Sequence, residues 1–222
     1  MKKYFLTAAA LLLLSPFTAS AVSVGTTTMT MFADDYTQNA NLGNGNGLYA
    51  VDYEADIGSQ SLSGYTFLSI DDAEVFCVEN TPLAPQGSPT YYEFFTSDYL
   101  SNASQVTWIA EQYFSNPNVV TKGVAQVAIW KTVFGGTYTD GDAAAADLLI
   151  ANYNSIADYN VRSAYLGNYL VAVSPASTNP VKTDYQNFLV RINATPVPEP
   201  GTLLLFGTGL AGLAAVSRRR RN

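Results

Sequence analysis

The chain has 222 residues, of which 48% are hydrophobic and only 13% are charged, and its formal net charge is −7. This length suits one domain, or two small ones, and is enough to bury a hydrophobic core. The chain contains no histidine, which excludes Ser-His-Asp and Cys-His catalytic sites and zinc sites with histidine ligands. The acidic pI of about 4.4 argues against a nucleic-acid partner, because binding to phosphates requires a basic surface.

The first 21 residues predict a secretory signal peptide. Lys2 and Lys3 precede an apolar run at residues 5–14, and Ala19 and Ala21 fit the small-x-small cleavage rule. We therefore expect signal peptidase to remove residues 1–21, and the mature chain to start near Val22.

The body that follows, residues 22–193, is predicted to be rich in strands in its first half. Alternating or β-branched and aromatic segments predict strands at residues 22–31, 48–56, 65–70, 75–79 and 91–95. Residues 39–47 are rich in glycine and asparagine and predict a loop. Residues 81–89 contain three prolines and predict an irregular connection.

The period of the pattern then changes to that of helices. Helical spacing of apolar residues predicts helices at residues 104–114, 123–134 and 142–153, with Thr139 or Asp140 as the cap of the third. The second is apolar on nearly all sides and should be buried. Strand-like composition returns at residues 161–173 and 188–192. The expected fold class is α+β, a strand-rich body with a central section of about three helices.

The C-terminal region has three parts in order. Residues 194–201 form a proline-rich linker that contains Pro198-Glu199-Pro200, residues 202–217 form an apolar segment predicted to be a transmembrane helix, and Arg218, Arg219, Arg220 and Arg221 follow it. Arginines at one end of an apolar segment orient it with that end in the cytoplasm. The apolar run is shorter than the roughly 20 residues of a full crossing, which favours a temporary anchor.

This arrangement, over residues 198–222, resembles the PEP-CTERM sorting signal, also called the ice-binding-protein C-terminal domain, a name that carries no evidence of ice binding. The resemblance implies a Gram-negative bacterium that makes exopolysaccharide. It also implies an exosortase that cuts near Pro198-Glu199-Pro200 after transient anchoring in the inner membrane.

The only cysteine, Cys77, cannot form an internal disulfide. It lies in Phe76-Cys77-Val78-Glu79, and 49 residues later the chain reads Gln126-Val127-Ala128-Ile129-Trp130. These strings together resemble the paired signatures of bacterial thioester domains, with the best match over residues 65–153. The resemblance implies an internal thioester between the Cys77 and Gln126 side chains, supported by a pocket of Phe76, Glu79, Ala128 and Trp130.

Two other interpretations of the cysteine stay open. Cys77 can be a packed small hydrophobe, with Gln126 as a hydrogen-bonded core amide. It can also be a redox-active thiol or form an intermolecular disulfide.

Further candidate residues have simpler interpretations. The acidic pairs could bind calcium or act as acid and base, but none has EF-hand spacing, which favours solvated surface acids: Asp34-Asp35, Asp71-Asp72 and Asp140-Gly141-Asp142. Lys122, just before the predicted helix at residues 123–134, and Lys131, within it, are predicted to be solvated cations. The 15 tyrosines fit a sugar-stacking platform and ordinary strand packing equally well.

The sequence therefore predicts an exported cell-surface or extracellular-matrix protein, an adhesin that couples to amines through the Cys77–Gln126 thioester. The alternative is a non-covalent structural or carbohydrate-binding biofilm matrix protein with a packed free cysteine. No enzymatic activity, cofactor or metal is expected. The expected partners are signal peptidase, exosortase and an unidentified amine-bearing ligand, with no nucleic acid.

Overall fold

The computed structural model describes residues 21–42, 46–58, 62–79, 87–139, 142–174 and 185–194, and within them the side chains of residues 33–52 and of residue 194 are not described. The predicted signal peptide up to residue 20 and the sorting segment, with its expected transmembrane helix at residues 202–217, lie outside these ranges. Among the described residues, no helix is both long enough and apolar enough to cross a membrane.

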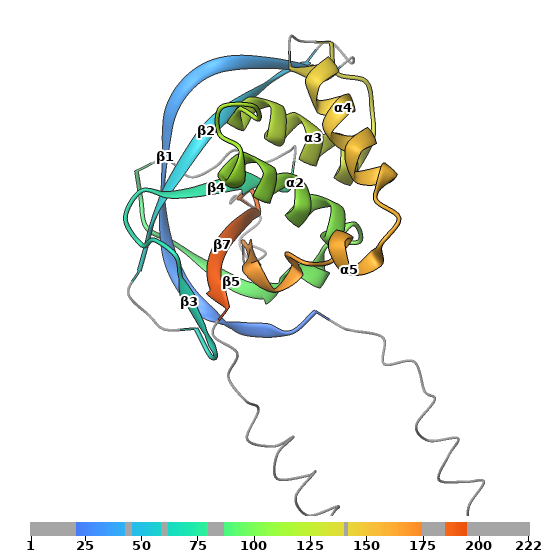
Figure 1. The fold of residues 1–222 in the computed structure, drawn as a ribbon. Coiled ribbons are helices and arrows are strands. Elements are labelled where there is room, and N and C mark those ends of the chain that lie inside the picture. Colours follow the sequence, from blue (N-terminus) through green and yellow to red (C-terminus); the bar gives the residue numbers. More distant parts are fainter. Residues whose placement is uncertain are drawn as a thin grey trace, which may run out of the picture.

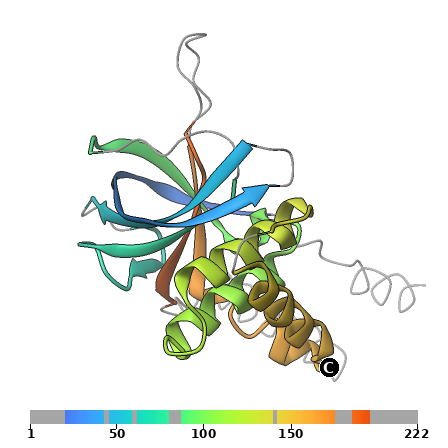
Figure 2. The ribbon, with the colours of Figure 1, turned by 90° about the horizontal axis from the view of Figure 1, so that it is seen from above.

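The described strands form one antiparallel sheet that closes on itself. They are β1 (Ser23–Leu42), β2 (Asn46–Ile57), β3 (Tyr65–Phe67), β4 (Ala73–Cys77), β5 (Thr90–Thr96), β6 (Tyr169–Val173) and β7 (Phe188–Ala194). Their order is β3-β7-β4-β2-β1-β5-β6, and β6 also pairs with β7. That last pairing closes a barrel and leaves no open edge on either strand along the paired stretch. Figure 2 shows the strands gathered on one side of the molecule and the helices on the other.

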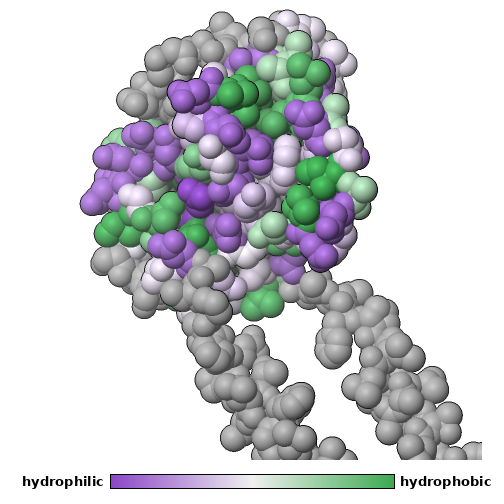
Figure 3. Space-filling view, viewed as in Figure 1, coloured by the Kyte–Doolittle hydropathy of each residue, from purple (hydrophilic) through white to green (hydrophobic). Residues whose placement is uncertain are grey.

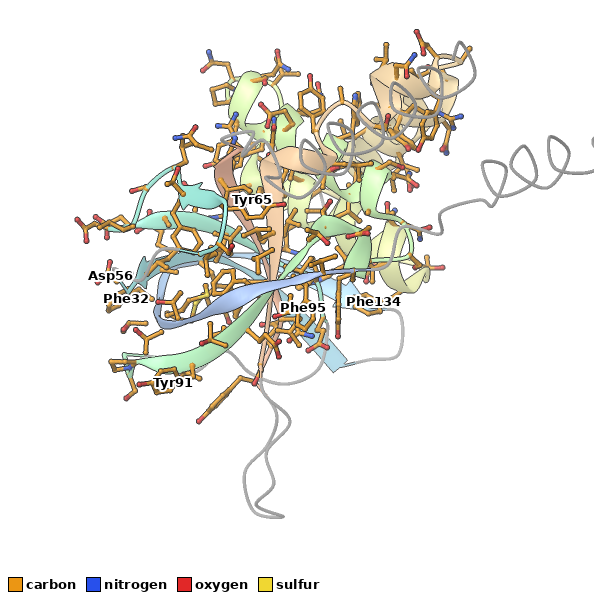
Figure 4. The ribbon with its side chains drawn as sticks, turned by 90° about the horizontal axis from the view of Figure 1, so that it is seen from below. Phe32, Asp56, Tyr65, Tyr91, Phe95 and Phe134 are labelled. Atoms are coloured by element: carbon orange, nitrogen blue, oxygen red, sulfur yellow. The ribbon has the colours of Figure 1, made fainter. Side chains whose placement is uncertain are left out.

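Strand alternation places alternate side chains inside the barrel. On β1, Met29 and Met31 are fully buried, whereas Phe32 is exposed. On β5, Tyr92 is buried and Tyr91 is exposed. Figure 4 shows Phe32 and Tyr91 projecting from strands on the part of the barrel that the helices do not cover.

The helices pack together against one side of the barrel (Figure 1). They are α2 (Ala103–Ser115), α3 (Lys122–Phe134), α4 (Ala143–Ser155) and the short α5 (Tyr159–Arg162). Thr121 caps α3 by accepting a hydrogen bond from the Val124 N–H, and Gly135 ends it with a φ of 68°. Helix α3 lies between α2 and α4 and contacts β2 and β4, which explains why it is buried on nearly all sides.

The α+β class is confirmed, and the structure corrects several boundaries. Strand β1 continues to Leu42 and β2 starts at Asn46, so the predicted loop at residues 39–47 is mostly a hairpin, with pairs such as Asn39↔Tyr49. Ladder pairing along the whole hairpin here outweighs the local turn preference of asparagine. Asp142, and neither Thr139 nor Asp140, occupies the N-cap position of α4, and it makes no side-chain capping bond.

The segment predicted as a strand at residues 161–173 is also partly helical. Helix α5 ends at Arg162, a 3₁₀ turn spans Leu166–Asn168, and only Tyr169–Val173 is strand. The Asp158 side chain accepts a hydrogen bond from the Asn160 N–H and so starts α5. The described residues therefore contain four α-helices, one more than expected.

The first strand begins, and the last strand ends, at the same end of the molecule. The start of β1 and the end of β7 both lie at the lower end in Figure 1. On the face drawn in Figure 3, exposed apolar side chains form small separate patches among polar ones.

Candidate functional site

Cys77 is the last residue of β4, at the point where pairing with β2 has stopped. Strand β2 pairs with β4 from Ala55↔Ala73 to Tyr53↔Val75 and no further. On the other side, the Val78 N–H donates to the carbonyl of Asn187, just before β7. Because backbone groups of successive strand residues point to opposite sides, the Cys77 N–H and C=O point toward β2, which no longer pairs with β4 at this position.

The side chain of Gln126 occupies that position. The Cys77 N–H donates to Gln126 Oε1 at 2.8 Å, and Gln126 Nε2 donates to the Cys77 carbonyl at 2.7 Å. Gln126 is only 2% exposed. Its carboxamide therefore takes the place of a strand partner, and satisfies two buried backbone groups that β2 does not pair.

The Cys77 side chain faces the barrel interior. Phe76, the preceding residue, makes edge contacts with the rings of Tyr113 and Phe114 on α2, so Cys77 points to the opposite face of β4. Cys77 is directly opposite Phe188 in the ladder between β4 and β7. The cysteine is 1% exposed, and its thiol is free.

Burial raises the pKa of the Cys77 thiol, and the positive charge of Lys122 lowers it in part. Lys122 is only 7% exposed, and its Nζ donates to the Tyr53 carbonyl at 2.8 Å and to the Glu74 carboxylate. The Tyr113 hydroxyl donates to the same carboxylate at 2.9 Å. The prediction that Lys122 is a solvated cation is therefore wrong.

Lys131 is also held by neighbouring groups. Its Nζ donates to the Ala143 carbonyl at 3.1 Å and to Asp147 Oδ1 at 2.7 Å, and its side chain is 10% exposed. The prediction of a solvated cation is wrong here too. Both lysines lie on a helix that is covered on nearly all sides, so their charged ends reach groups on the elements around it.

Of the other residues that the thioester resemblance names, Phe76, Ala128 and Trp130 are buried around α3 and β4, and Glu79 is half-buried. Ala128 is fully buried. Trp130 stacks on Tyr138 with a centroid distance of 6.4 Å, and its Nε1 has no hydrogen-bond partner in the described part of the chain. Glu79 has a different set of contacts: its carboxylate accepts hydrogen bonds from the Asn187 N–H at 3.2 Å and from Asn187 Nδ2 at 2.6 Å. Glu79 thus ties the chain after β4 to the chain before β7.

The structure describes only some of the remaining predicted site residues. Asp71 and Asp72 are exposed, as expected of solvated surface acids. Within the described residues there is no group of three or more acidic or cysteine side chains placed to hold a metal ion. Several predicted site residues lie outside the described residues: Ala19, Pro198, Glu199, Pro200, Arg218, Arg219, Arg220, Arg221 and Asp140.

Two features escaped sequence reasoning. Glu111 on α2 is buried with two partners from the sheet: Arg191 Nη2 donates to it at 2.7 Å and the Tyr169 hydroxyl at 2.9 Å. Tyr92 on β5 is completely buried, and its hydroxyl has no hydrogen-bond partner among the described residues. Neither has a local sequence signal: the partners of Glu111 lie 58 and 80 residues away in the chain, and the burial of Tyr92 depends on the strands that surround it in the barrel.

Comparison with protein-family models finds the PEP-CTERM protein-sorting motif at residues 196–221. No curated protein and no solved structure matches the chain. The predicted sorting signal is therefore confirmed, and it implies an exported protein with exosortase as its processing partner. None of these comparisons supports the resemblance to thioester domains.

Proposed function

We propose that this exported protein is an adhesin that forms an internal thioester between Cys77 and Gln126 and uses it to couple covalently to amines. The observation that carries the proposal is the pair of reciprocal hydrogen bonds that holds the Gln126 carboxamide against Cys77 in a buried site. The two residues come from a strand and a helix 49 positions apart in the chain.

The same hydrogen bonds suit nucleophilic attack on the carboxamide. The Cys77 N–H already donates to Gln126 Oε1, the oxygen that gains negative charge when sulfur adds to Cδ, and a donor in that position stabilises the developing oxyanion. A strand side chain stands roughly perpendicular to the plane of its backbone hydrogen bonds. This favours an approach of the thiol from above the carboxamide plane, the direction from which an amide carbon is attacked.

The reaction balances with the groups at hand. The Sγ–Cδ bond forms, the Cδ–Nε2 bond breaks, and the thiol proton leaves with the nitrogen as ammonia. A primary amine, such as a lysine side chain on another surface, then attacks Cδ, forms an amide and releases the Cys77 thiol. Burial of both residues supports the proposal, because a thioester survives only where water is excluded.

Export fits this chemistry, since the partner must lie outside the cell. We propose that the protein acts at the cell surface or in the extracellular matrix of an exopolysaccharide-producing bacterium, after transient anchoring in the inner membrane. Its ligand is then an amine-bearing surface or matrix molecule, and the protein acts by attachment rather than as an enzyme.

A non-covalent structural or carbohydrate-binding matrix protein is the second candidate. It is favoured by the satisfaction of both polar groups of Gln126 by the Cys77 backbone, which explains the buried glutamine without a covalent bond. The raised pKa of the Cys77 thiol is also what a merely packed cysteine would have.

Intact mass spectrometry of the secreted wild-type protein separates the two candidates. A thioester lowers the mass by one ammonia, and treatment with methylamine replaces that loss by one methylamine. Cys77→Ala and Gln126→Ala should each show the mass expected from sequence and take up no methylamine, because either change removes the same bond. Gln112→Ala is the matched control: this α2 glutamine also bonds a backbone carbonyl, that of Trp108, and its loss should change neither result. A wild-type mass that shows no loss of ammonia and no response to methylamine would contradict the thioester and favour the second candidate.

A further inference from the structure

Lys122 and Glu74 form an ion pair that groups from the surrounding elements hold in place. The Lys122 side chain, at the start of α3, is 7% exposed, and that of Glu74, on β4, is 30% exposed. Lys122 Nζ donates to Glu74 Oε2 and, at 2.8 Å, to the Tyr53 carbonyl of β2. The Tyr113 hydroxyl of α2 donates to the other carboxylate oxygen, Glu74 Oε1, at 2.9 Å. The Phe76 ring centroid lies 5.7 Å from Nζ, so the pair lies beside an aromatic ring and is largely shielded from water.

These contacts suit an amide bond between the two side chains as well as they suit an ion pair. If Lys122 Nζ were joined to Glu74 Cδ, the nitrogen would keep one hydrogen, and the Tyr53 carbonyl already accepts a hydrogen bond from that nitrogen. The amide oxygen would be Oε1, to which the Tyr113 hydroxyl already donates. Both polar groups of an amide thus have partners in place, and a neutral amide costs less to bury than two charges.

The second lysine of the same helix lies in different surroundings. Lys131 Nζ donates to a backbone carbonyl, that of Ala143, and forms an ion pair with Asp147 Oδ1 at 2.7 Å. The Asp147 side chain, however, is 67% exposed, and no hydroxyl of the described residues is bonded to it. Water stabilises the charges of such an exposed pair. The two lysines are therefore alike in their ion pairs and differ in what surrounds the carboxylate.

We propose that Lys122 and Glu74 condense to an intramolecular amide once the chain has folded, an inference that goes beyond the proposed function and does not rest on it. A proton first passes from Nζ to Oε2, and the apolar surroundings favour the neutral pair that results. Nζ then attacks Cδ, and the Tyr113 hydroxyl stabilises the negative charge that develops on Oε1. The Cδ–Oε2 bond breaks, and Oε2 leaves as water with two of the three Nζ protons. The third proton stays on the amide nitrogen.

The bond would join the same two elements as the contact between Cys77 and Gln126. Lys122 and Glu74 lie on α3 and β4, 48 positions apart in the chain. With a single cysteine, the chain cannot form an internal disulfide. An amide between the helices and the barrel would constrain the unfolded chain in the way that a disulfide does, and so reinforce an exported protein.

Peptide mapping of the secreted protein tests the bond directly. Digestion should give one branched peptide that contains residues 74 and 122 and has lost one water. In the Cys77→Ala background, where no thioester forms, the intact mass should be one water below the sequence mass. Lys122→Arg keeps the positive charge without a nucleophilic amine, and should restore that water. Lys131→Arg is the matched control and should leave the loss of water unchanged.

The loss of water does not disturb the measurement of the thioester. It is common to wild type, Cys77→Ala and Gln126→Ala, so the masses expected for all three fall together. The difference of one ammonia between wild type and either variant therefore still reports the thioester alone.

The role of the Tyr113 hydroxyl has its own test. Tyr113→Phe keeps the ring that packs against Phe76 and removes the donor to Glu74 Oε1. Pulse–chase labelling, with the mobility of the denatured chain on a gel as the readout, should show cross-linking about 100-fold slower than in wild type. Circular dichroism should show an unchanged fold. Cross-linking at the wild-type rate would overturn the role given to this hydroxyl.

Two results would overturn the cross-link itself. One is the recovery of residues 74 and 122 in separate linear peptides, with the full sequence mass for Cys77→Ala. The other is a loss of water that persists in Lys122→Arg. The mapping needs no variant, so the inference stays testable even if Lys122→Arg does not fold. Because the mass of ammonia reports the thioester and the branched peptide reports the amide, failure of one proposal is distinguishable from failure of the other.

Discussion

The first prediction concerns how much the two hydrogen bonds between Gln126 and the Cys77 backbone contribute to the free energy of unfolding. Replacing Gln126 by methionine keeps most of the side-chain volume and removes both hydrogen bonds to Cys77. The change should be made in the Cys77→Ala background, where no thioester can form and the backbone groups of residue 77 are still present. The comparison then measures the hydrogen bonds alone.

The expected effect is large because both backbone groups are buried. Leaving one buried donor or acceptor unsatisfied costs about 1–3 kcal/mol, so losing partners for an N–H and a C=O should lower the free energy of unfolding by about 2–6 kcal/mol. Cys77→Ala alone removes only a small apolar side chain, and should cost about 1 kcal/mol. We therefore expect a clearly larger loss of stability from the change at Gln126 than from the change at Cys77.

Urea unfolding followed by tryptophan fluorescence measures these values. Trp108 and Trp130 are the two tryptophans of the chain, and both lie on the helices that cover the site. Gln112→Met in the same background controls for a general effect of methionine on a helix, and should change stability little. A loss below about 1 kcal/mol for Gln126→Met would refute the role of the carboxamide as a substitute strand residue. It would also remove the geometric basis of the candidate site.

Three further predictions follow from other parts of the chain. Changing Pro198 and Glu199 to alanine should leave full-length protein in the inner membrane, whereas the secreted wild type should lack residues 218–221; membrane fractionation and mass spectrometry of the C-terminal peptide check both. Glu111→Ala should lower the free energy of unfolding by about 3–5 kcal/mol in urea titration, because it leaves a partly buried arginine and a buried tyrosine hydroxyl without their carboxylate; an effect as small as that of a surface substitution would contradict a buried ion pair. The pKa of Tyr138 is raised from 10.0 to about 12 by burial, so its folded form keeps the proton more strongly than its unfolded form. Its contribution to stability should therefore be complete below pH 10 and lost as pH rises through about 12, and Tyr138→Phe in the Cys77→Ala background should show a smaller decline over that range.

The parts of this protein that the sequence determined are those whose signal is local. Export and sorting are encoded in the order of basic, apolar and small residues at one end, and in Pro198-Glu199-Pro200, an apolar run and arginines at the other, so the sorting motif could be predicted and was confirmed. Helices α2, α3 and α4 were placed within two residues of their observed ends, because one face or all faces of each helix are apolar at helical spacing.

Tertiary structure decided the elements whose stability comes from distant partners. The asparagine- and glycine-rich segment around Asn39 is strand because it pairs along β2, and its own composition favours a turn. Lys122 is buried because α3 is enclosed between two helices and the barrel, where the Tyr53 carbonyl and the Glu74 carboxylate accept its hydrogen bonds. Neither partner could be identified from the residues around the lysine.

The candidate site shows the same division. The resemblance named Cys77 and Gln126 from two short strings, but the strings contain no information on how the two residues meet. The pairing of β2 with β4 stops at Tyr53↔Val75, which leaves the Cys77 backbone groups without a strand partner, and the position of α3 brings Gln126 to bond them. Pairing of β7 with β4 and closure of the barrel by β6 and β7 bring Phe188 opposite Cys77 and against the Tyr92 ring. These contacts join strands and a helix far apart in the chain, and only the packed fold could determine them, because residue spacing specifies local geometry and leaves long-range pairing open.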